Sequence, residues 1–268
     1  DEALLKQLGY KPKNHKLNLK PWIDLQKKIK NKKHKVKIAV VGKYTNLKDS
    51  YKSLNEALVH GGIENFAEVN IQWINSEKEN KISLLKKLKG SNGILIPGGF
   101  GFRGINGKIN AIKYARENNI PFFGICLGMQ LAVIEIAQNI LKIKNAHSSE
   151  FKKTTKSVVG LMTEWVNKNK IERRDKNSNK GGTMRLGAYK AILKKDSKIF
   201  SIYKNKVINE RHRHRYEVNQ KFLPRFENKG YYFSGMSPDG LLPEVLESKN
   251  HKWFIGVQFH PELKSRPL

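Results

Sequence analysis

The residues best suited to covalent chemistry in this sequence are one cysteine and one histidine–carboxylate pair. Cys126 is the only cysteine among 268 residues and lies in the run Phe122–Gln130 (FFGICLGMQ). This run predicts a short apolar strand, a corner flanked by glycines, and a helix that continues through Leu131, Ile134 and Ala137. At such a corner the amides of the helix N-terminus favour a thiolate and can receive an oxyanion.

A base that could serve this thiol stands near the other end of the chain, in His260-Pro261-Glu262. In an extended segment His260 and Glu262 point to the same side, and Pro261 stiffens the backbone between them. His260 could act as base and then as acid, while Glu262 fixes its tautomer. Each group taken singly has an ordinary structural explanation, but together with Cys126 they indicate a thiol hydrolase.

Alternating strands and helices are expected to bring these groups together. Apolar alternation predicts strands near residues 36–41, 69–73 and 93–96, and helical spacing predicts helices over 49–60, 82–88 and 109–117. This order implies an α/β fold with a mostly parallel central sheet flanked by helices. Reactive groups gather at the carboxyl ends of parallel strands, where both Cys126 and Pro97-Gly98-Gly99 are expected.

The C-terminal half has a different pattern. Residues 167–180 are polar and unpatterned, which predicts a mobile loop, and strand-like segments follow at 186–193, 207–218, 231–235 and 253–259. We expect these segments to be added antiparallel strands that return His260 to the nucleophile. Residues 1–35, rich in Lys and Asn, predict the tail and linker of an upstream domain, before a domain at 36–268. Because the chain begins with Asp1, we expect it to be a piece of a longer protein.

The composition excludes several classes of protein. A net charge of +29 would ordinarily suggest a nucleic-acid partner, but the lysines are scattered and densest in apparent linkers such as residues 27–35. We therefore favour a solvated basic surface, with a polyanion-binding module as an alternative. No apolar stretch approaches the roughly 18 residues of a membrane span. A single cysteine excludes an internal disulfide and fits the cytoplasm.

Several runs resemble the class I glutamine amidotransferases, which have a flavodoxin-like fold. They are Gly124–Gln130, Pro97-Gly98-Gly99 and His260-Pro261-Glu262. A narrower resemblance, to the amidotransferase domain of the CTP synthases, rests on the runs 41–44, 51–53, 97–104, 115–118, 182–187 (GTMRLG) and 211–219 (RHRHRYEVN). It covers about residues 36–267, and the last two runs are not general features of amidotransferases.

The resemblance implies that Cys126 attacks the side-chain amide of L-glutamine and releases ammonia. His260 would act as base and acid, Glu262 would orient it, and water would hydrolyse the thioester. The residues expected to bind glutamine and its oxyanion are Gly99, Phe100, Leu127, Gly128, Met129, Gln130, Glu150 and Arg215. A carboxylate suits the substrate's ammonium, and a guanidinium suits its carboxylate.

The resemblance also implies partners. In the CTP synthases a preceding synthetase domain activates UTP with ATP and Mg²⁺, and the full enzyme is expected to be a homotetramer. Nothing here resembles that domain, and the sequence lacks a Gly-x-x-x-x-Gly-Lys-Ser/Thr loop. The chain alone should therefore be at most a glutaminase, with no cofactor or metal of its own. GTP would be an allosteric activator, contacted by Lys52, Arg103 and Arg185.

Three features depart from the family pattern, and none touches a proposed catalytic group. Leu263 stands where an aromatic residue is common, the 167–180 segment is unusually basic, and the chain stops early at Leu268. Besides the polyanion-binding module, the alternative is an amidotransferase or γ-glutamyl hydrolase of another pathway. The Arg-His-Arg-His-Arg run argues against that alternative.

Overall fold

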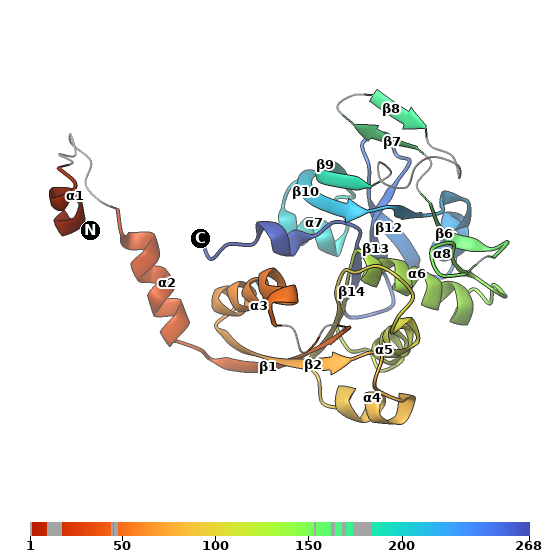
Figure 1. Cartoon of the computed structure of the whole chain (residues 1–268), viewed down its shortest axis with the longest axis horizontal. Coiled ribbons are helices and arrows are strands. Elements are labelled where there is room, and N and C mark those ends of the chain that lie inside the picture. The colour runs from red at the N-terminus through yellow and green to blue at the C-terminus, as the bar shows by residue number, and fades with distance from the viewer. Residues whose placement is uncertain are drawn as a thin grey trace.

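A mixed β-sheet forms the centre of the molecule (Figure 1). The computed structural model describes residues 2–9, 18–43, 45, 48–152, 154–161, 164–167, 170–173 and 184–268, and nine strands within them form this sheet. In sheet order they are β10 (Val207–His214), β9 (Arg185–Leu193), β12 (Tyr231–Met236), β13 (Pro243–Ser248), β14 (Phe254–Val257), β4 (Phe122–Ile125), β3 (Gly93–Ile96), β1 (His34–Gly42) and β2 (Ala67–Asn75).

One half of the sheet is parallel. Neighbouring strands in the order β2-β1-β3-β4-β14 all pair in parallel, which is the flavodoxin-like order. Every residue of β3 and β14 is buried, as expected for parallel strands covered on both faces. The helices that follow these strands are α3 (Lys52–Glu64), α4 (Lys81–Leu88), α5 (Ile105–Glu117) and α6 (Leu127–Asn139).

Apolar cores lie on both faces of the sheet. On one face α4, α5 and α6 pack against the strands, with Leu84, Ile112 and Met129 fully buried. On the other face Leu54 of α3 joins a second cluster that also contains the nucleophile candidate Cys126. None of the helices in the described ranges is long and apolar enough to cross a membrane.

The other half of the sheet is antiparallel, from β14 through β13, β12 and β9 to β10. Smaller sheets adjoin it, and short helices connect its strands. These elements are β5 (His147–Ser148), β6 (Ser157–Leu161), β7 (Glu164–Asn167), β8 (Lys170–Arg173), β11 (Tyr216–Val218), α7 (Lys198–Tyr203) and α8 (Leu223–Glu227). The predicted α/β architecture with a parallel centre and antiparallel additions is confirmed. The segment 253–259, predicted as an added antiparallel strand, instead supplies β14, which pairs in parallel with β4 and in antiparallel fashion with β13.

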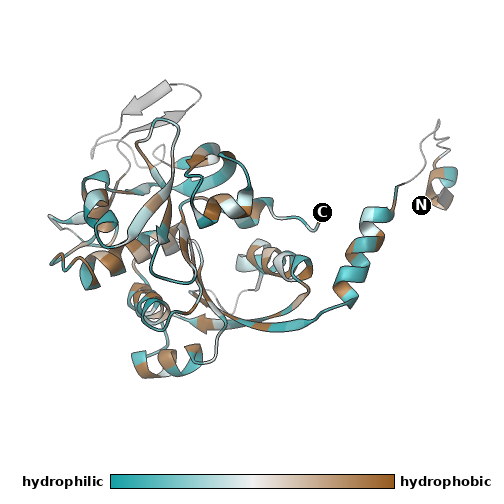
Figure 2. Cartoon of the chain, turned by 180° about the vertical axis from the view of Figure 1, so that it is seen from behind, coloured by the Kyte–Doolittle hydropathy of each residue, from teal (hydrophilic) through white to brown (hydrophobic). Residues whose placement is uncertain are grey.

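The N-terminal segment, predicted to be a linker, contains two helices. These are α1 (Glu2–Gln7), which lies apart from the sheet, and α2 (Lys20–Lys30), which contacts α3 through Nζ of Lys28 and Oε2 of Glu64 at 2.6 Å (Figures 1 and 2). Only Leu25 of α2 is buried. Its apolar residues Trp22, Leu25 and Ile29 recur at helical spacing, a signal that the prediction of a linker missed.

Three local predictions differ in part from the structure. The helix predicted over 49–60 begins with a 3-10 turn at Lys48–Tyr51 and runs to Glu64. Gly62 lies inside this helix. A Cβ there would lie 2.7 Å from the carbonyl oxygen of Ala67, so the missing side chain allows the helix to pack closely against the start of β2. The strand predicted over 207–218 breaks between β10 and β11, which join different sheets. The predicted loop at 167–180 includes β8, and its residues 174–180 lie outside the described part.

Candidate active site

Cys126 occupies a sharp corner between β4 and α6. Its backbone has φ +52° and ψ −102°, a conformation that L-residues rarely adopt and that stores strain. The amide of Cys126 donates a 2.7 Å hydrogen bond to the carbonyl oxygen of Val257 in β14. The side chain is only 2% exposed. The predicted strand, corner and helix are therefore all present around the thiol.

Glycines allow α6 to lie directly on the sheet behind this corner. A Cβ on Gly128 would lie 2.2 Å from the carbonyl oxygen of Ile96 in β3. A Cβ on Gly124 would lie 2.7 Å from the carbonyl carbon of Gly128. Any larger residue would push the helix away. The free amides and positive end of α6 are thus held at the carboxyl edge of the parallel strands, beside Cys126.

His260 follows β14, the strand next to β4, and is oriented by Glu262. Its Nδ1 lies 2.7 Å from Oε1 of Glu262, and its amide donates to the carbonyl oxygen of Arg211 at 2.7 Å. Both residues lie at or beside the 3-10 turn Pro261–Lys264. The turn does not form the extended segment expected from the sequence, but it still brings carboxylate and imidazole together.

The pKa of His260 is raised to about 10. Burial acts to lower this pKa, but the interactions with Cys126 and Glu262 outweigh it. Nε2 of His260 forms no hydrogen bond of good geometry within the described ranges. The interactions with Cys126 and Glu262 therefore favour the imidazolium form of His260.

A cavity of about 450 Å³ opens beside these residues. Its lining comes from residues 49–54, the loop 97–100 after β3, Arg213, His260, Glu262 and Leu263. A Cβ on Gly98 would lie 2.6 Å from Cε1 of His260, so the loop backbone lies directly against the imidazole. The carboxyl ends of β3 and β14 thus meet in one cavity.

Two charged side chains hold the loop after β3. Lys43 is buried and donates a short hydrogen bond to the carbonyl oxygen of Phe100, and Oε1 of Glu150 accepts the amide of Gly101 at 2.7 Å. A Cβ on Gly99 would lie 3.5 Å from Cδ2 of Leu127, so the loop after β3 packs against the side chain of the first residue of α6. Lys43 is one of 52 Lys and Arg residues and was not among the predicted site residues.

The residues expected to hold glutamine differ in their surroundings. Phe100 is 40% exposed at the cavity, whereas Leu127, Gly128 and Met129 are buried at the start of α6. Gln130 is also buried, and its Nε2 donates to the carbonyl oxygen of Tyr216 at 2.8 Å. Its side chain therefore joins α6 to the segment after β10.

Glu150 and Arg215 interact electrostatically. Burial raises the pKa of Glu150, while the amide of Gly101, Lys43 and Arg215 act to lower it. Arg215 is half-buried. A carboxylate and a guanidinium are therefore close to the loop that lines the cavity.

The structure does not bring together the three residues expected to contact GTP. Lys52 is exposed and lines the cavity beside His260. Arg103 lies 3.5 Å from Oε1 of Glu77 and lines a different cavity. Arg185 is 2% exposed, and its guanidinium contacts Glu244 and Glu217. A buried guanidinium held by two carboxylates is not available to a nucleotide in this conformation, so we do not propose Arg185 as a contact.

Comparison with known proteins places this arrangement in a family. The model of the family "Glutamine amidotransferase class-I" matches residues 46–268. CTP synthase of Pelagibacter ubique is 60% identical over 94% of this chain and 46% of its own length, and that of Rhizobium johnstonii is 55% identical over 100% and 49%. The chain therefore spans about half the length of the curated relatives it matches.

A solved structure gives the same result. The glutaminase domain of Trypanosoma brucei CTP synthase, solved with bound acivicin, is 38% identical and superposes with a TM-score of 0.75. The match covers 87% of this chain and 88% of that domain. The chain belongs to the class I glutamine amidotransferase family, within the group formed by the glutaminase domains of CTP synthases.

Proposed function

We propose that Cys126, His260 and Glu262 hydrolyse glutamine and that the ammonia serves the conversion of UTP to CTP. The observation that carries this proposal is the strained corner at Cys126, with φ +52°, at the N-terminus of α6. His260, paired with Glu262 at 2.7 Å, follows the adjacent parallel strand. This is the arrangement that an activated thiol and its acid–base partner require.

In the first half-reaction His260 is proposed to take the proton of the Cys126 thiol, which the raised pKa of His260 favours. Sγ of Cys126 attacks the side-chain amide carbon, and the carbonyl electrons move to oxygen. The amides of Gly99 and Leu127 are proposed to stabilise this oxyanion. His260 then gives its proton to the amide nitrogen, the carbon–nitrogen bond breaks, and ammonia leaves a thioester on Cys126.

The second half-reaction restores the enzyme. Neutral His260 removes a proton from water, and the resulting hydroxide attacks the thioester carbon. The carbon–sulfur bond breaks, glutamate leaves, and the thiolate and imidazolium are regenerated. Glu262 holds Nδ1 throughout, so that Nε2 performs both proton transfers.

Substrate binding is proposed to use Glu150 for the ammonium of glutamine and Arg215 for its carboxylate. Gln130, whose amide contacts the carbonyl oxygen of Tyr216, would shape the pocket. Phe100 at the cavity and Met129 in the first turn of α6 would pack around the substrate. Lys52 and Arg103 are proposed GTP contacts, although they line different cavities.

The rest of the reaction is assigned to a partner. The curated relatives are about twice as long as this chain, which supports an additional synthetase domain in the same polypeptide. That domain would use ATP and Mg²⁺ to activate UTP. The assembly is proposed to be a cytoplasmic homotetramer.

The test joins this chain to a synthetase domain and compares the wild type with Cys126→Ala. We expect glutamine-dependent CTP formation, with GTP present, to be lost in Cys126→Ala. Formation from added ammonium chloride should remain, because it bypasses the thiol. Equal ammonia release from glutamine by both proteins would sink the assignment of the nucleophile. Loss of both glutamine-dependent and ammonium-dependent synthesis would instead indicate a damaged fold.

A further inference from the structure

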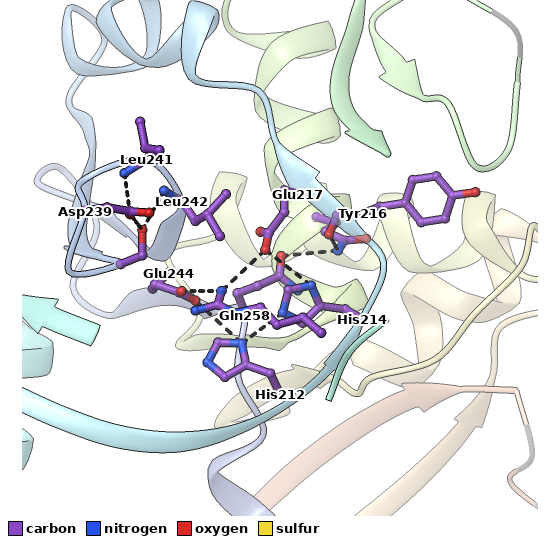
Figure 3. Close-up of polar contacts among 12 residues, drawn as sticks. His212, His214, Tyr216, Glu217, Asp239, Leu241, Leu242, Glu244 and Gln258 are labelled. Atoms are coloured by element: carbon purple, nitrogen blue, oxygen red, sulfur yellow. Dashed lines mark hydrogen bonds and ion pairs between the residues drawn. The ribbon is translucent and has the colours of Figure 1, made fainter. Parts of the chain in front are cut away.

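A group of titratable side chains lies buried behind the active site, between the antiparallel half of the sheet and β11. We call it the buried cluster, and its members are Arg185, His212, His214, Glu217 and Glu244. Figure 3 shows both histidines and both glutamates pointing toward one another from different strands. Neither the cavity nor the proposed reaction uses any of these side chains, so their burial calls for a separate explanation.

Arg185 is the centre of the buried cluster. Its Nη1 donates to Oε1 of Glu244 at 2.5 Å and lies 3.4 Å from Oε1 of Glu217. Its guanidinium also lies 4.5 Å from the ring centroid of Tyr189. Two buried carboxylates thus share one guanidinium, and they come from β13 and β11. Arg185 thereby joins three strands, including its own.

The two histidines connect β10 to this centre. The rings of His212 and His214 meet through Nδ1 and Nε2 at 2.9 Å, and Nδ1 of His214 lies 3.5 Å from Oε1 of Glu217. Burial lowers the pKa of both histidines, and the charge of Arg185 lowers it further. Such a contact needs one donor and one acceptor, so at least one ring is neutral. In the pairing of β10 with β9, His214 stands opposite Arg185.

The backbone of the same segment contacts the catalytic groups. Residues of β10 alternate, with the histidines buried and Arg211 and Arg213 exposed. The carbonyl oxygen of Arg211 accepts the amide of His260 at 2.7 Å, and that of Arg213 lies 3.8 Å from Sγ of Cys126. The carbonyl oxygen of Tyr216 accepts Nε2 of Gln130 at 2.8 Å. One segment therefore contacts the base, the nucleophile and the first turn of α6.

A second connection runs through β13 and β14. The amide of Gln258 donates to the carbonyl oxygen of Glu244 at 2.8 Å, and Oε1 of Gln258 accepts from Gln130 at 3.2 Å. Gln258 precedes His260 by two residues. The strand that carries Glu244 is thus linked both to α6 and to the approach to the catalytic histidine.

We infer that the buried cluster positions the segment 211–216 against Cys126 and His260. Its members are positioning residues, because they act through the backbone of that segment rather than through contact with substrate. A purely structural role would stabilise the sheet equally but would leave the chemistry of the thiol unaffected. This inference rests on the proposed glutaminase function and deepens it.

The test compares the same substitution at two buried arginines. Arg185→Met removes the guanidinium from the buried cluster, while Arg116→Met removes it from Glu135, a buried carboxylate of α6 that it contacts at 2.7 Å. Both variants should melt at lower temperature. On folded protein, only Arg185→Met should lower kcat for ammonia release and the rate of iodoacetamide alkylation of Cys126, by roughly 10- to 100-fold, because a misplaced reactive group costs about that much.

A milder pair of variants covers the case in which Arg185→Met does not fold. His214→Phe keeps a ring of similar size and loses the contacts through Nδ1 and Nε2. We expect a fall of about tenfold in kcat and in alkylation rate. His214→Gln, whose amide nitrogen can replace Nε2, should restore part of both. A structural role would lower the melting temperature of these variants without moving either rate.

The inference is overturned if folded His214→Phe, and Arg185→Met where it folds, stay within about twofold of Arg116→Met in both rates. Failure of the proposed function gives a different result. In that case wild-type protein would release no ammonia with GTP and the synthetase domain present, and Cys126 would react no faster than in urea. There would then be no catalytic geometry for the buried cluster to maintain, and the inference would fail together with the proposed function.

Discussion

The two halves of the sheet place their polar side chains differently. In the parallel half, β3 and β14 are apolar and fully buried, and the groups proposed for chemistry follow the ends of strands, as Cys126 and His260 do. In the antiparallel half, Glu244 and Glu247 lie inside a strand and are fully buried. The comparison indicates that the parallel strands present reactive groups, while the antiparallel strands fix the backbone around them.

Buried carboxylates within the antiparallel half also differ from one another. Glu247 accepts four hydrogen bonds, from the hydroxyls of Ser234 and Tyr232 and from the amides of Lys198 and Ile199. Glu244 depends on Arg185, and its Oε2 has no hydrogen bond of good geometry within the described ranges. All four hydrogen bonds of Glu247 thus come from β12 and the start of α7, whereas Glu244 belongs to a network shared between several strands.

The largest expected effect on activity comes from disturbing the contact between Gly98 and His260 at the strand ends of the parallel half. In Gly98→Ala the new methyl would lie 2.6 Å from Cε1 of His260 and displace the imidazole. We expect ammonia release to fall by about 100-fold or more with little change in melting temperature. Gly61→Ala is the matched control, since its Cβ meets nothing within 4 Å. An active Gly98→Ala would show that the loop yields and that this contact does not set the geometry.

The next-largest effect should be a loss of stability in the antiparallel half with no change in the reactivity of Cys126. Glu247→Gln keeps the shape but replaces one acceptor oxygen by a donor facing other donors. We expect a loss of about 2 kcal/mol in the free energy of unfolding, measured with urea, and an unchanged rate of Cys126 alkylation. A slower alkylation in folded Glu247→Gln would mean that any buried carboxylate of this half affects the site, which would weaken the special role given to the buried cluster.

The smallest expected effect concerns the pH dependence of stability where the two halves meet at His260. Because the pKa of His260 is raised to about 10 in the folded chain, its contribution is fully present below pH ~6.5 and is lost as pH rises through about 10. In that window the folded state binds more protons, so stability falls with pH. Glu262→Gln should lower this pKa and reduce stability by about 1 kcal/mol at pH 8. This expectation would be contradicted if the free energies of unfolding of the two proteins changed with pH in the same way between pH ~6 and ~10.

Much of the parallel half was predictable because its signals are local. The run Gly93–Ile96 is wholly apolar and ends at a proline, and the Cys126 corner is marked by glycines on both sides. β13 gave no signal because Glu244 and Glu247 interrupt its apolar pattern, and their partners are far away in the sequence. α2 was missed although Trp22, Leu25 and Ile29 recur at helical spacing, because its lysine-rich composition was interpreted as a linker.

The candidate site was predictable to a similar degree. The thiol, base and carboxylate stand out by residue type and spacing, and the structure places them at neighbouring strand ends. The charge of a residue does not, however, reveal whether its side chain is buried in the folded chain. The family resemblance implied that Arg185 contacts a nucleotide, but it is enclosed by carboxylates. Lys43, which holds the loop after β3, was not singled out.

The backbone strain at Cys126 has a consequence for selection experiments. A conformation with φ +52° and ψ −102° is one that glycine adopts at less cost than cysteine, by about 1–3 kcal/mol. Libraries screened only for resistance to heat should therefore drift toward glycine at this position. Libraries screened for growth that depends on ammonia from glutamine should retain cysteine. Such opposing outcomes at one position would measure how much stability the chain gives up for its thiol.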